Sequence, residues 1–482
     1  MRRIAAFTLL GLALGGCMLG PDYRRPSVDA PPTWRFEEKE AREIIDTLWW
    51  QQFEDPVLNR LIEIALKENL DIKIAASRLA ELQGRYEVAR AALWPTVGAG
   101  ASAERRRNTE RGQVPLPSTV ENPVELYQGS IFANWEIDLW GKLRRGTEAA
   151  RADLLSTEEG RRGVILSLVS SVASAYINLR SLDRQLWIAR DTAMSRVESY
   201  RIFSLRFNEG FVSQLELSQV KSEYERGLAA IPALEKGIAQ QENALSILIG
   251  RNPGAITRGK TLDELGLPAV PAGLPSDLLA RRPDIRQAEQ DLISANAQIG
   301  IARARYFPTI SLTGMFGWES TSLSQLFRGP SRMWNWAIPM TQPIFTGGSI
   351  AGEIKAVEAF RDEALLRYQK AIQGAFRDVE DSLVDQRRTR EQLGLQKRQV
   401  ESLREYARTA RLTYDNGYTS YIAVLDADRS LFDAQLAYSQ TQGALFQALI
   451  NLYKAMGGGW VVEVEKMAAS PGQGAVLIES AK

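Results

Sequence analysis

Residues 71–96 read DIKIAASRLAELQGRYEVARAALWPT, and residues 284–309 read DIRQAEQDLISANAQIGIARARYFPT. The two stretches share an Asp-Ile start, an Ala-Arg-Ala triplet and an aromatic residue before Pro-Thr, all at an offset of 213. A second block also recurs: Phe207-Asn208-Glu209-Gly210 returns as Tyr414-Asp415-Asn416-Gly417, at an offset of 207. Two long repeats of this kind indicate a duplicated architecture rather than a short-period solenoid.

After each Pro-Thr the sequence alternates between apolar and polar or small residues. This pattern predicts one β-hairpin at about 95–138 and another at about 308–345. Strands of about ten residues have the length of a tilted membrane-spanning strand. Tryptophans near the strand ends suit a membrane interface. A soluble sheet packed on helices would also have one apolar face, so the strands alone leave both interpretations open.

Long helical patterns follow each predicted strand pair. Apolar residues step by three and four from Ile165 to Ala189, which is typical of a coiled coil. A helix from about 142 to 207 would be about 100 Å long at about 1.5 Å per residue. Gly210 and Gly417 are expected to end the long helices in the left-handed conformation. The sequence therefore predicts helical hairpins at about 142–249 and 348–456.

Composition excludes several kinds of active site. The 482 residues contain no histidine and one cysteine, and the formal net charge is +1. Histidine bases, Ser-His and Cys-His pairs, and metal sites built from His or Cys are excluded. Nothing in the charge suggests a nucleic-acid partner. A carboxylate-based hydrolase is not excluded by composition, but no site for one is visible, and we expect neither an enzyme nor a metal site.

The N-terminus carries a secretory pattern. Met1-Arg2-Arg3 precedes an apolar stretch from Ile4 to Leu14 and the small pair before Cys17. Leu14-Gly15-Gly16-Cys17 resembles a bacterial lipobox, which implies cleavage before Cys17 and a covalent N-acyl and S-diacylglycerol lipid on it. An ordinary signal peptide with a chance cysteine is the alternative. Met18 stands where an aspartate would favour retention in the inner membrane, so we expect the outer membrane.

The predicted organisation has six parts. Residues 1–16 form the signal peptide, and residues 17–48, rich in proline, form a lipidated extended tether. The remaining parts are a first structural repeat, a linker rich in Gly and Pro, a second repeat and a C-terminal tail, at residues 49–250, 251–276, 277–457 and 458–482.

The chain resembles a known family, the TolC-like outer-membrane efflux channels, in the lipoprotein branch typified by OprM. The resemblance covers nearly the whole mature chain and rests on motifs in a fixed order: Gly20-Pro21-Asp22-Tyr23, Trp49-Trp50, Asp138-Leu139-Trp140-Gly141, Arg281-Arg282-Pro283-Asp284-Ile285, Pro343-Ile344-Phe345 and Val424-Leu425-Asp426-Ala427.

The resemblance implies an α+β membrane protein that is internally duplicated and assembles as a homotrimer. Three copies would close a twelve-stranded β-barrel in the outer membrane, continued by a long α-helical barrel in the periplasm. Transport through such a channel is passive. An inner-membrane pump of the resistance-nodulation-division type drives it, and a periplasmic adaptor protein joins the two.

In relatives, charged residues close the periplasmic end of the tunnel. The matching positions are Asp426 and Arg429, and Glu216 in the first repeat. Three-fold symmetry would turn Asp426 into a ring of carboxylates that Arg429 would partly neutralise. The alternative is that these are solvated helix charges, each contributing well under 1 kcal/mol, and we prefer that interpretation for Asp428. The turns that would meet the adaptor contain Gly210, Phe211, Gly417 and Tyr418.

Two other functions remain open. The same fold could serve a type I secretion transporter instead of an efflux pump. A periplasmic coiled-coil adaptor lipoprotein would share the lipid anchor and the helical hairpins, although it would have no need of two membrane-compatible strand pairs. The sequence does not identify a substrate.

Overall fold

The computed structural model describes residues 18–36, 48–109, 111, 121–270, 275–457 and 461. The chain divides into two compact units. The strand unit comprises Met1–Ser27, Arg78–Thr157 and Gln287–Tyr368, and the hairpin unit comprises Val28–Ser77, Glu158–Arg286 and Gln369–Lys482. Each unit contains matching segments of both repeats.

The strand unit contains one antiparallel sheet with the order β1-β2-β3-β4. The strands are β1 (Thr96–Arg106), β2 (Val124–Ile137), β3 (Thr309–Ser320) and β4 (Arg332–Ala337), and β5 (Met340–Thr341) also pairs with β3. β2 and β3 join the two hairpins, with Gly129 opposite Trp318. Large apolar side chains are exposed along the sheet: Val97, Ile131, Phe132, Phe316, Trp334 and Trp336.

The fourth strand is shorter than its alternating pattern predicts. β4 has six residues and stops before Ile338 and Pro339. Proline has no N–H to donate to a neighbouring strand, so the ladder breaks there. The carbonyl of Pro339 still accepts a hydrogen bond from the N–H of Ser311 at 3.1 Å, and regular pairing resumes in the two residues of β5. The prediction of four strands of about ten residues each is wrong for this strand.

Four helices continue from the strands: α3 (Leu70–Ala91), α4 (Lys142–Asn208), α7 (Pro283–Ala304) and α8 (Ser349–Asp415). Tryptophans fix the junctions. The indole of Trp135 donates to the carbonyl of Leu93 at 3.0 Å, and that of Trp140 donates to the carbonyl of Pro308 at 2.8 Å. Trp140 also packs on Phe307, with ring centroids 4.8 Å apart.

Residues 18–27 form an extended strap on α4 and α7 of the strand unit. Arg145, whose side chain is 2% exposed, donates to the carbonyl of Leu19 and pairs with Asp22 at 2.7 Å. Arg25 and Tyr23 both donate to the Glu289 carboxylate, at 2.7 and 3.0 Å. The predicted tether is thus a docked segment in this region.

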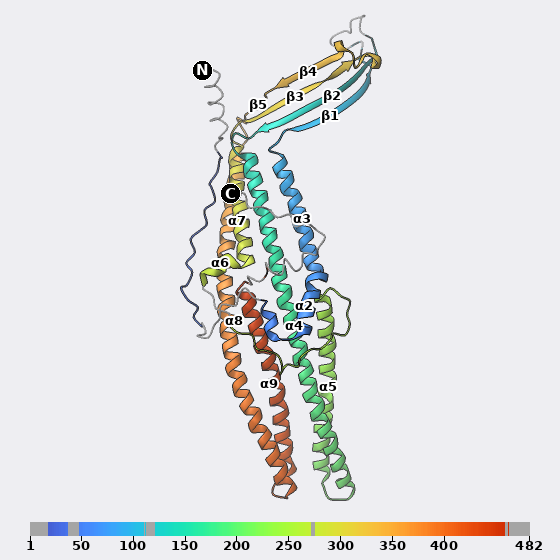
Figure 1. Ribbon diagram of the computed structural model, residues 1–482, viewed down its shortest axis with the longest axis vertical. Helices are drawn as coiled ribbons and strands as arrows, with labels where there is room; N and C mark the ends of the chain where they lie inside the picture. Colours follow the sequence, from blue (N-terminus) through green and yellow to red (C-terminus); the bar gives the residue numbers. More distant parts are fainter. Residues whose placement is uncertain are drawn as a thin grey trace. The chain divides into compact units, whose positions relative to one another are not determined.

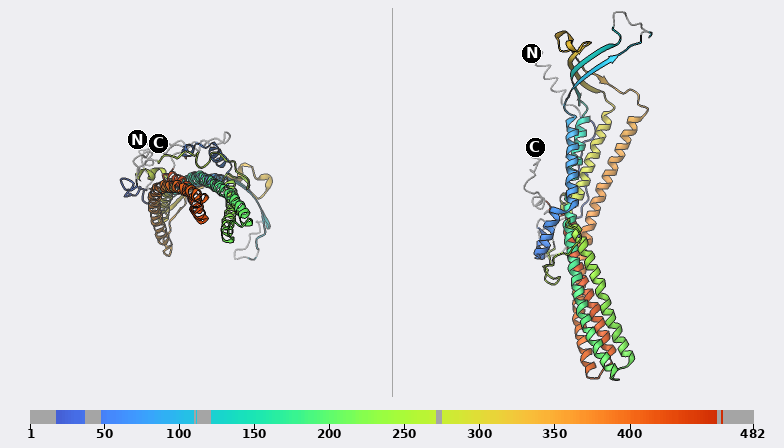
Figure 2. Two further views of the ribbon diagram at one scale, coloured as in Figure 1. Left: turned by 90° about the horizontal axis from the view of Figure 1, so that it is seen from below. Right: turned by 90° about the vertical axis from the view of Figure 1, so that its right-hand side faces the viewer.

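The hairpin unit is built on two long helical hairpins, α4 with α5 (Gln214–Leu248) and α8 with α9 (Tyr421–Ala455) (Figures 1 and 2). Three parts of the chain contribute to their core. These are the predicted apolar stripe of α4, the aromatic residues of η1 (Trp49–Phe53) and the apolar face of α2 (Pro56–Glu68). Trp49 stacks on Tyr453 of α9 at 5.3 Å. In the described part of the chain one helix, α4, is long and apolar enough to cross a membrane, but 61% of its most apolar 18-residue window is buried inside the protein, as expected for a core helix.

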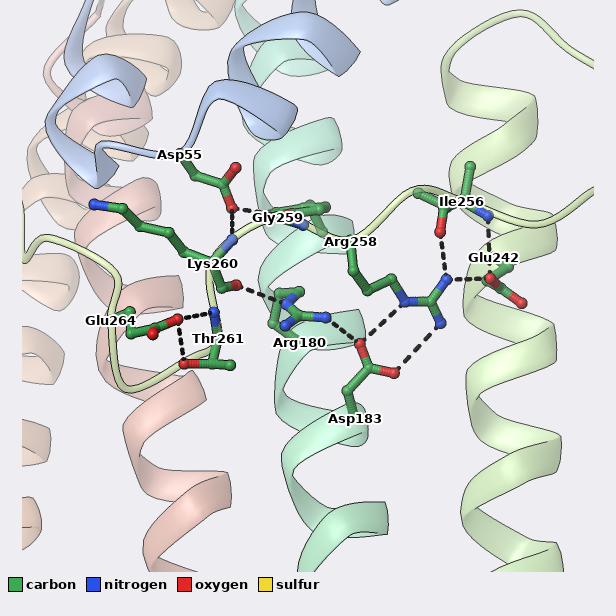
Figure 3. Close-up of polar contacts among 11 residues, drawn as sticks. Asp55, Arg180, Asp183, Glu242, Ile256, Arg258, Gly259, Lys260, Thr261 and Glu264 are labelled. Carbon is green, nitrogen blue, oxygen red and sulfur yellow. Dashed lines mark hydrogen bonds and ion pairs between the residues drawn. The ribbon is translucent and has the colours of Figure 1, made fainter.

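The linker after α5 is held by buried polar contacts (Figure 3). Asp55, which is fully buried, accepts hydrogen bonds from the hydroxyl of Tyr176 at 2.7 Å and the backbone N–H of Lys260 at 3.1 Å. Arg258 of the linker pairs with Asp183 of α4 at 3.1 Å and also with Glu242 of α5. Residues 251–270, the described part of the predicted linker before residue 275, are therefore fixed across the helices of the hairpin unit.

The duplication extends to individual hydrogen bonds. Asn69, before α3, donates to the carbonyl of Leu248 at 2.9 Å. Arg282, which follows α6 (Leu278–Arg281) and precedes α7, donates to the carbonyl of Ala455 at 3.0 Å. The donors are 213 residues apart and the acceptors 207 apart, which are the two offsets of the repeat. In each repeat, the residue just before α3 or α7 is thus hydrogen-bonded to the end of the returning helix, α5 or α9.

Candidate functional site: the hairpin tips

Both hairpins end in the same tight turn. Gly210 and Gly417 have φ of 79° and 77°, so the predicted left-handed caps are confirmed. The N–H of Phe211 reaches back to the carbonyl of Arg206, and that of Tyr418 to the carbonyl of Thr413, as in a Schellman motif. The side chains of Phe211 and Tyr418 are 80% and 85% exposed. The structure thus presents two aromatic side chains to solvent at the tips.

Above the turns, an aromatic cluster joins the two hairpins. Phe203 of α4 packs on Tyr421 of α9 at 4.2 Å, and Tyr421 contacts Tyr414 of α8 at 4.9 Å. Phe203 and Tyr421 are both 2% exposed. Burying aromatic side chains supplies most of the packing energy of such a cluster, so the tips of one chain are held together by an apolar contact.

A buried carboxylate lies beyond this cluster. Glu223 of α5 is 6% exposed and accepts a hydrogen bond from Nε of Arg429 of α9 at 3.1 Å. Arg196 of α4, 8% exposed, pairs with the same carboxylate at 3.4 Å and packs on the ring of Phe432. Desolvation lowers the pKa of Arg196, and Glu223 opposes that effect. One buried acid therefore links three helices of the two hairpins.

The predicted gate residues of α9 differ in their surroundings. Asp426 is exposed, and its carboxylate accepts a hydrogen bond from the Tyr406 hydroxyl at 3.4 Å. Arg429 bonds to Glu223 of the other hairpin rather than to Asp426, although the charge of Asp426 also acts on it. The hydrogen bond to Glu223 raises the pKa of Arg429. Asp428, treated above as a solvated charge, is half-buried, and desolvation raises its pKa.

Glu216 has a definite local role. The hydroxyl of Ser213 accepts from the N–H of Glu216 at 3.2 Å, and the carboxylate of Glu216 accepts from the N–H of Ser213 at 2.8 Å. This is a capping box at the start of α5. In the second repeat Ala423 stands at the equivalent position, and Ser420 makes no side-chain cap. The structure brings Glu216 near the turn but not into contact with Asp426 or Arg429.

Sequence reasoning missed Glu223 and Arg196. The signal for Glu223 was a charge within an otherwise small and apolar stripe, since Val220, Glu223 and Gly227 are all on the buried face of α5. The second repeat has Ser430 at the position equivalent to Glu223, so comparison of the two repeats did not indicate a buried acid there. Among the described residues, no group of three or more Asp, Glu, His or Cys could hold a metal ion. Cys17, the predicted signal peptide and the residues after 461 lie outside the described part of the chain.

Comparisons with known proteins agree with this architecture. The family model described as outer membrane efflux protein matches residues 61–251 and 274–458. The chain is 35% identical over 460 residues to the solvent efflux pump outer membrane protein SrpC of Pseudomonas putida, covering 94% of this chain and 97% of SrpC. It is 34% identical to the cation efflux system protein CusC of Escherichia coli over 457 residues, covering 94% of this chain and 97% of CusC.

Solved structures show the same fold. The open state of the MtrE outer membrane channel of Neisseria gonorrhoeae has a TM-score of 0.84 at 30% identity, covering 92% of this chain and 99% of MtrE. A crystal structure of CusC has a TM-score of 0.82 at 32% identity, covering 92% of this chain and all of that chain. The chain belongs to the outer membrane efflux protein family.

Proposed function

We propose that this protein is the outer-membrane channel of a tripartite efflux system. The observation that carries the proposal is the single sheet of strands whose ends continue directly into helical hairpins. Within one chain β1 and β4 each have a neighbour on one side only. Open strand edges are not tolerated in lipid, so copies of the chain must close the sheet, and the resemblance makes the number three.

The proposed partners follow from the exposed turns of the hairpin unit. The exposed aromatic turns at Gly210-Phe211 and Gly417-Tyr418 would meet a periplasmic adaptor protein, which would connect the channel to a resistance-nodulation-division pump in the inner membrane. SrpC is named for solvent efflux and CusC for cation efflux. Relatives with such different names support a permissive channel whose selectivity resides mainly in the pump.

The gate is proposed at the tips. Asp426 is exposed on α9 and would form a ring of three carboxylates about the trimer axis. Arg429 would keep the two hairpins of each chain together through Glu223, which keeps the aperture narrow. Contact with the adaptor would separate the hairpins and break this pair. Glu216 is proposed as a tip residue whose charge also stabilises the turn through its cap.

Lipid anchoring through Cys17 is also proposed, with the strap as its support. Met18, the next residue, lies against Gly141, where an added Cβ would come within 2.8 Å of the Met18 side chain. The N–H of Leu19 donates to the carbonyl of Trp140 at 3.1 Å, at the base of the sheet. An acyl chain on the preceding residue would therefore start beside the membrane-facing strands and add outer-membrane lipid contacts.

Membrane fractionation and export assays test the proposal. We expect trimers in outer-membrane fractions that dissociate on heating, and loss of small-molecule export when the gene is deleted. Recovery in a soluble periplasmic fraction without trimers would support the adaptor alternative and contradict the channel. Loss of protein secretion with unchanged small-molecule export would instead support the type I secretion alternative.

A further inference from the structure

A small cavity of about 170 Å³ lies in the strand unit among α4, α7 and α8. Carboxylates, a guanidinium, a hydroxyl, an amide and an aromatic ring line it: Asp153, Asp291, Glu363, Arg367, Ser294, Gln298 and Phe360. Drug-sized pockets measure about 300–1,000 Å³, whereas a cavity of about 150 Å³ holds benzene. The space therefore suits a fragment-sized molecule.

The cavity faces away from the N-terminal strap. On α7 the strap contacts Glu289, Asn296 and Gly300. The cavity is lined by Asp291, Ser294 and Gln298 of the same helix, which lie about half a turn away at about 100° per residue. In the proposed channel the strap follows the lipid anchor on Cys17, which must lie outside the passage, so the strap face is the outer face and the cavity faces the passage. This placement, and only this, rests on the proposed function.

The cavity holds excess negative charge. Glu363 is paired with Arg367 at 2.5 Å, and that pair is solvent-exposed. Asp291 accepts a hydrogen bond from the Ser156 hydroxyl at 2.6 Å but forms no ion pair with any residue that the structure describes. Asp153 is half-buried, and among the described residues its carboxylate has no hydrogen-bond or ion-pair partner. Desolvation raises the pKa of Asp291, and the charge of Asp153 adds to that rise.

Two further side chains point to a bound molecule. Ser294 is 3% exposed, and its hydroxyl has no hydrogen-bond partner among the described residues. A buried hydroxyl without a partner costs about 1–3 kcal/mol, so a ligand that bonds to it would remove the penalty. Phe360 is 47% exposed at the cavity. The face of an exposed ring beside carboxylates attracts an organic cation.

We propose that this cavity is a binding subsite for a small organic ammonium cation, held by Asp153 and Asp291, with its apolar part on Phe360. A metal ion fits less well, because no three carboxylates in the described part of the chain converge as metal ligands. Each protomer would thus have one site at which cationic cargo binds during its passage through the channel. Such cargo would carry a protonated amine, whose N–H groups can bond to Ser294 and the carboxylates, beside an aromatic or aliphatic group.

The direct test titrates benzylammonium, whose N–H groups can bond to the Ser294 hydroxyl and to the carboxylates, into the purified full-length trimer at low salt and pH 7, with binding followed by calorimetry. We expect saturable binding that weakens at least fivefold in Asp153→Asn. The matched control is Asp362→Asn, which removes one charge from an exposed position of α8 outside the cavity, and it should retain wild-type affinity. Phe360→Leu should weaken binding while benzyl alcohol, a neutral aromatic, binds poorly to every form.

Ser294→Ala separates a ligand role from a structural one. We expect this variant to be at least as thermally stable as the wild type when ligand-free, yet to bind the probe more weakly. A loss of stability with unchanged affinity would assign Ser294 to packing and contradict its part in the site.

Other outcomes overturn the proposal. Absence of binding to a trimer that still conducts ions in bilayers would refute the subsite while leaving the channel function intact. Saturable binding of Mg²⁺ or Ca²⁺ alone, lost in Asp153→Asn and unaccompanied by ammonium binding, would replace the proposal with a metal site. Failure to form conducting trimers would count against the proposed function itself.

Discussion

Arg226 of α5 and Asp433 of α9 stand at equivalent positions of the two repeats, 207 residues apart, and form an ion pair at 3.4 Å. Both side chains are about half exposed. The neighbouring pair of Arg429 and Glu223 also joins α5 to α9, but its carboxylate is buried. Exposed pairs contribute about 0–1 kcal/mol, whereas breaking a buried pair leaves an uncompensated charge. These two ion pairs between the hairpins therefore contribute very different amounts to stability.

Replacing Glu223 with alanine should destabilise the tips. Arg196, 8% exposed, would lose its carboxylate partner, at a cost of about 3–5 kcal/mol. Hydrogen exchange of amides in α5 and α9 of the intact trimer reports this as faster local opening. Asp433→Asn is the control, with an expected effect of about 1 kcal/mol or less. Equal effects of the two variants would show that burial does not distinguish these pairs.

The two roles of Glu216, capping of α5 and a negative charge near the gate, can be tested separately. Glu216→Ala removes the capping box and should cost about 1 kcal/mol of local stability, seen as fraying of the first turn of α5. Glu216→Gln keeps a cap, because glutamine also serves at this position of a capping box. Single-channel conductance should rise in both variants if the charge matters to the gate. A rise in the alanine variant alone would limit Glu216 to its structural role.

The elements could be predicted because their signals are local. The pattern that gave a helix at 142–207 corresponds to Lys142–Asn208 in the structure, and the hairpin predicted at 95–138 contains Thr96–Arg106 and Val124–Ile137. The break in β4 was readable from Pro339, but the alternation on both sides obscured it. The role of Glu223 depends on which helices surround it, and no local pattern reveals which arginines approach from α4 and α9.

The close approach of the strap to α7 can be tested at Gly300. A Cβ at this position would lie 2.5 Å from the carbonyl oxygen of Leu19, which is too close without movement of the backbone. Gly300→Ala should displace the strap, cost about 1–3 kcal/mol by overpacking, and expose residues 18–27 to protease. Gly352→Ala on α8 is the control, since nothing lies within 4 Å of its added Cβ. Unchanged protease resistance in Gly300→Ala would show that the strap is not held there.

Asp428 should make the tips less stable as pH rises. Desolvation raises its folded-state pKa above the ordinary value of about 3.9 for Asp, while Arg411 and Arg196 oppose the rise. The protonated form is therefore favoured by folding, and its contribution is lost as pH rises through the folded pKa. Asp428→Asn should melt at a higher temperature than the wild type at pH 7 and at a similar temperature near pH 3.5. A difference that does not change with pH would contradict this assignment.

Single-channel conductance tests the central claim, a channel closed at its helical tips, most directly. Purified trimers would be inserted in planar bilayers, and the double variant Asp426→Ala/Arg429→Ala compared with the wild type. Removing the exposed carboxylate and the bond of Arg429 to Glu223 should widen the tip and raise conductance several-fold, while Asp433→Ala, which removes one partner of the exposed pair, should change it little. Equal conductance in the wild type and in Asp426→Ala/Arg429→Ala would contradict a gate at this position.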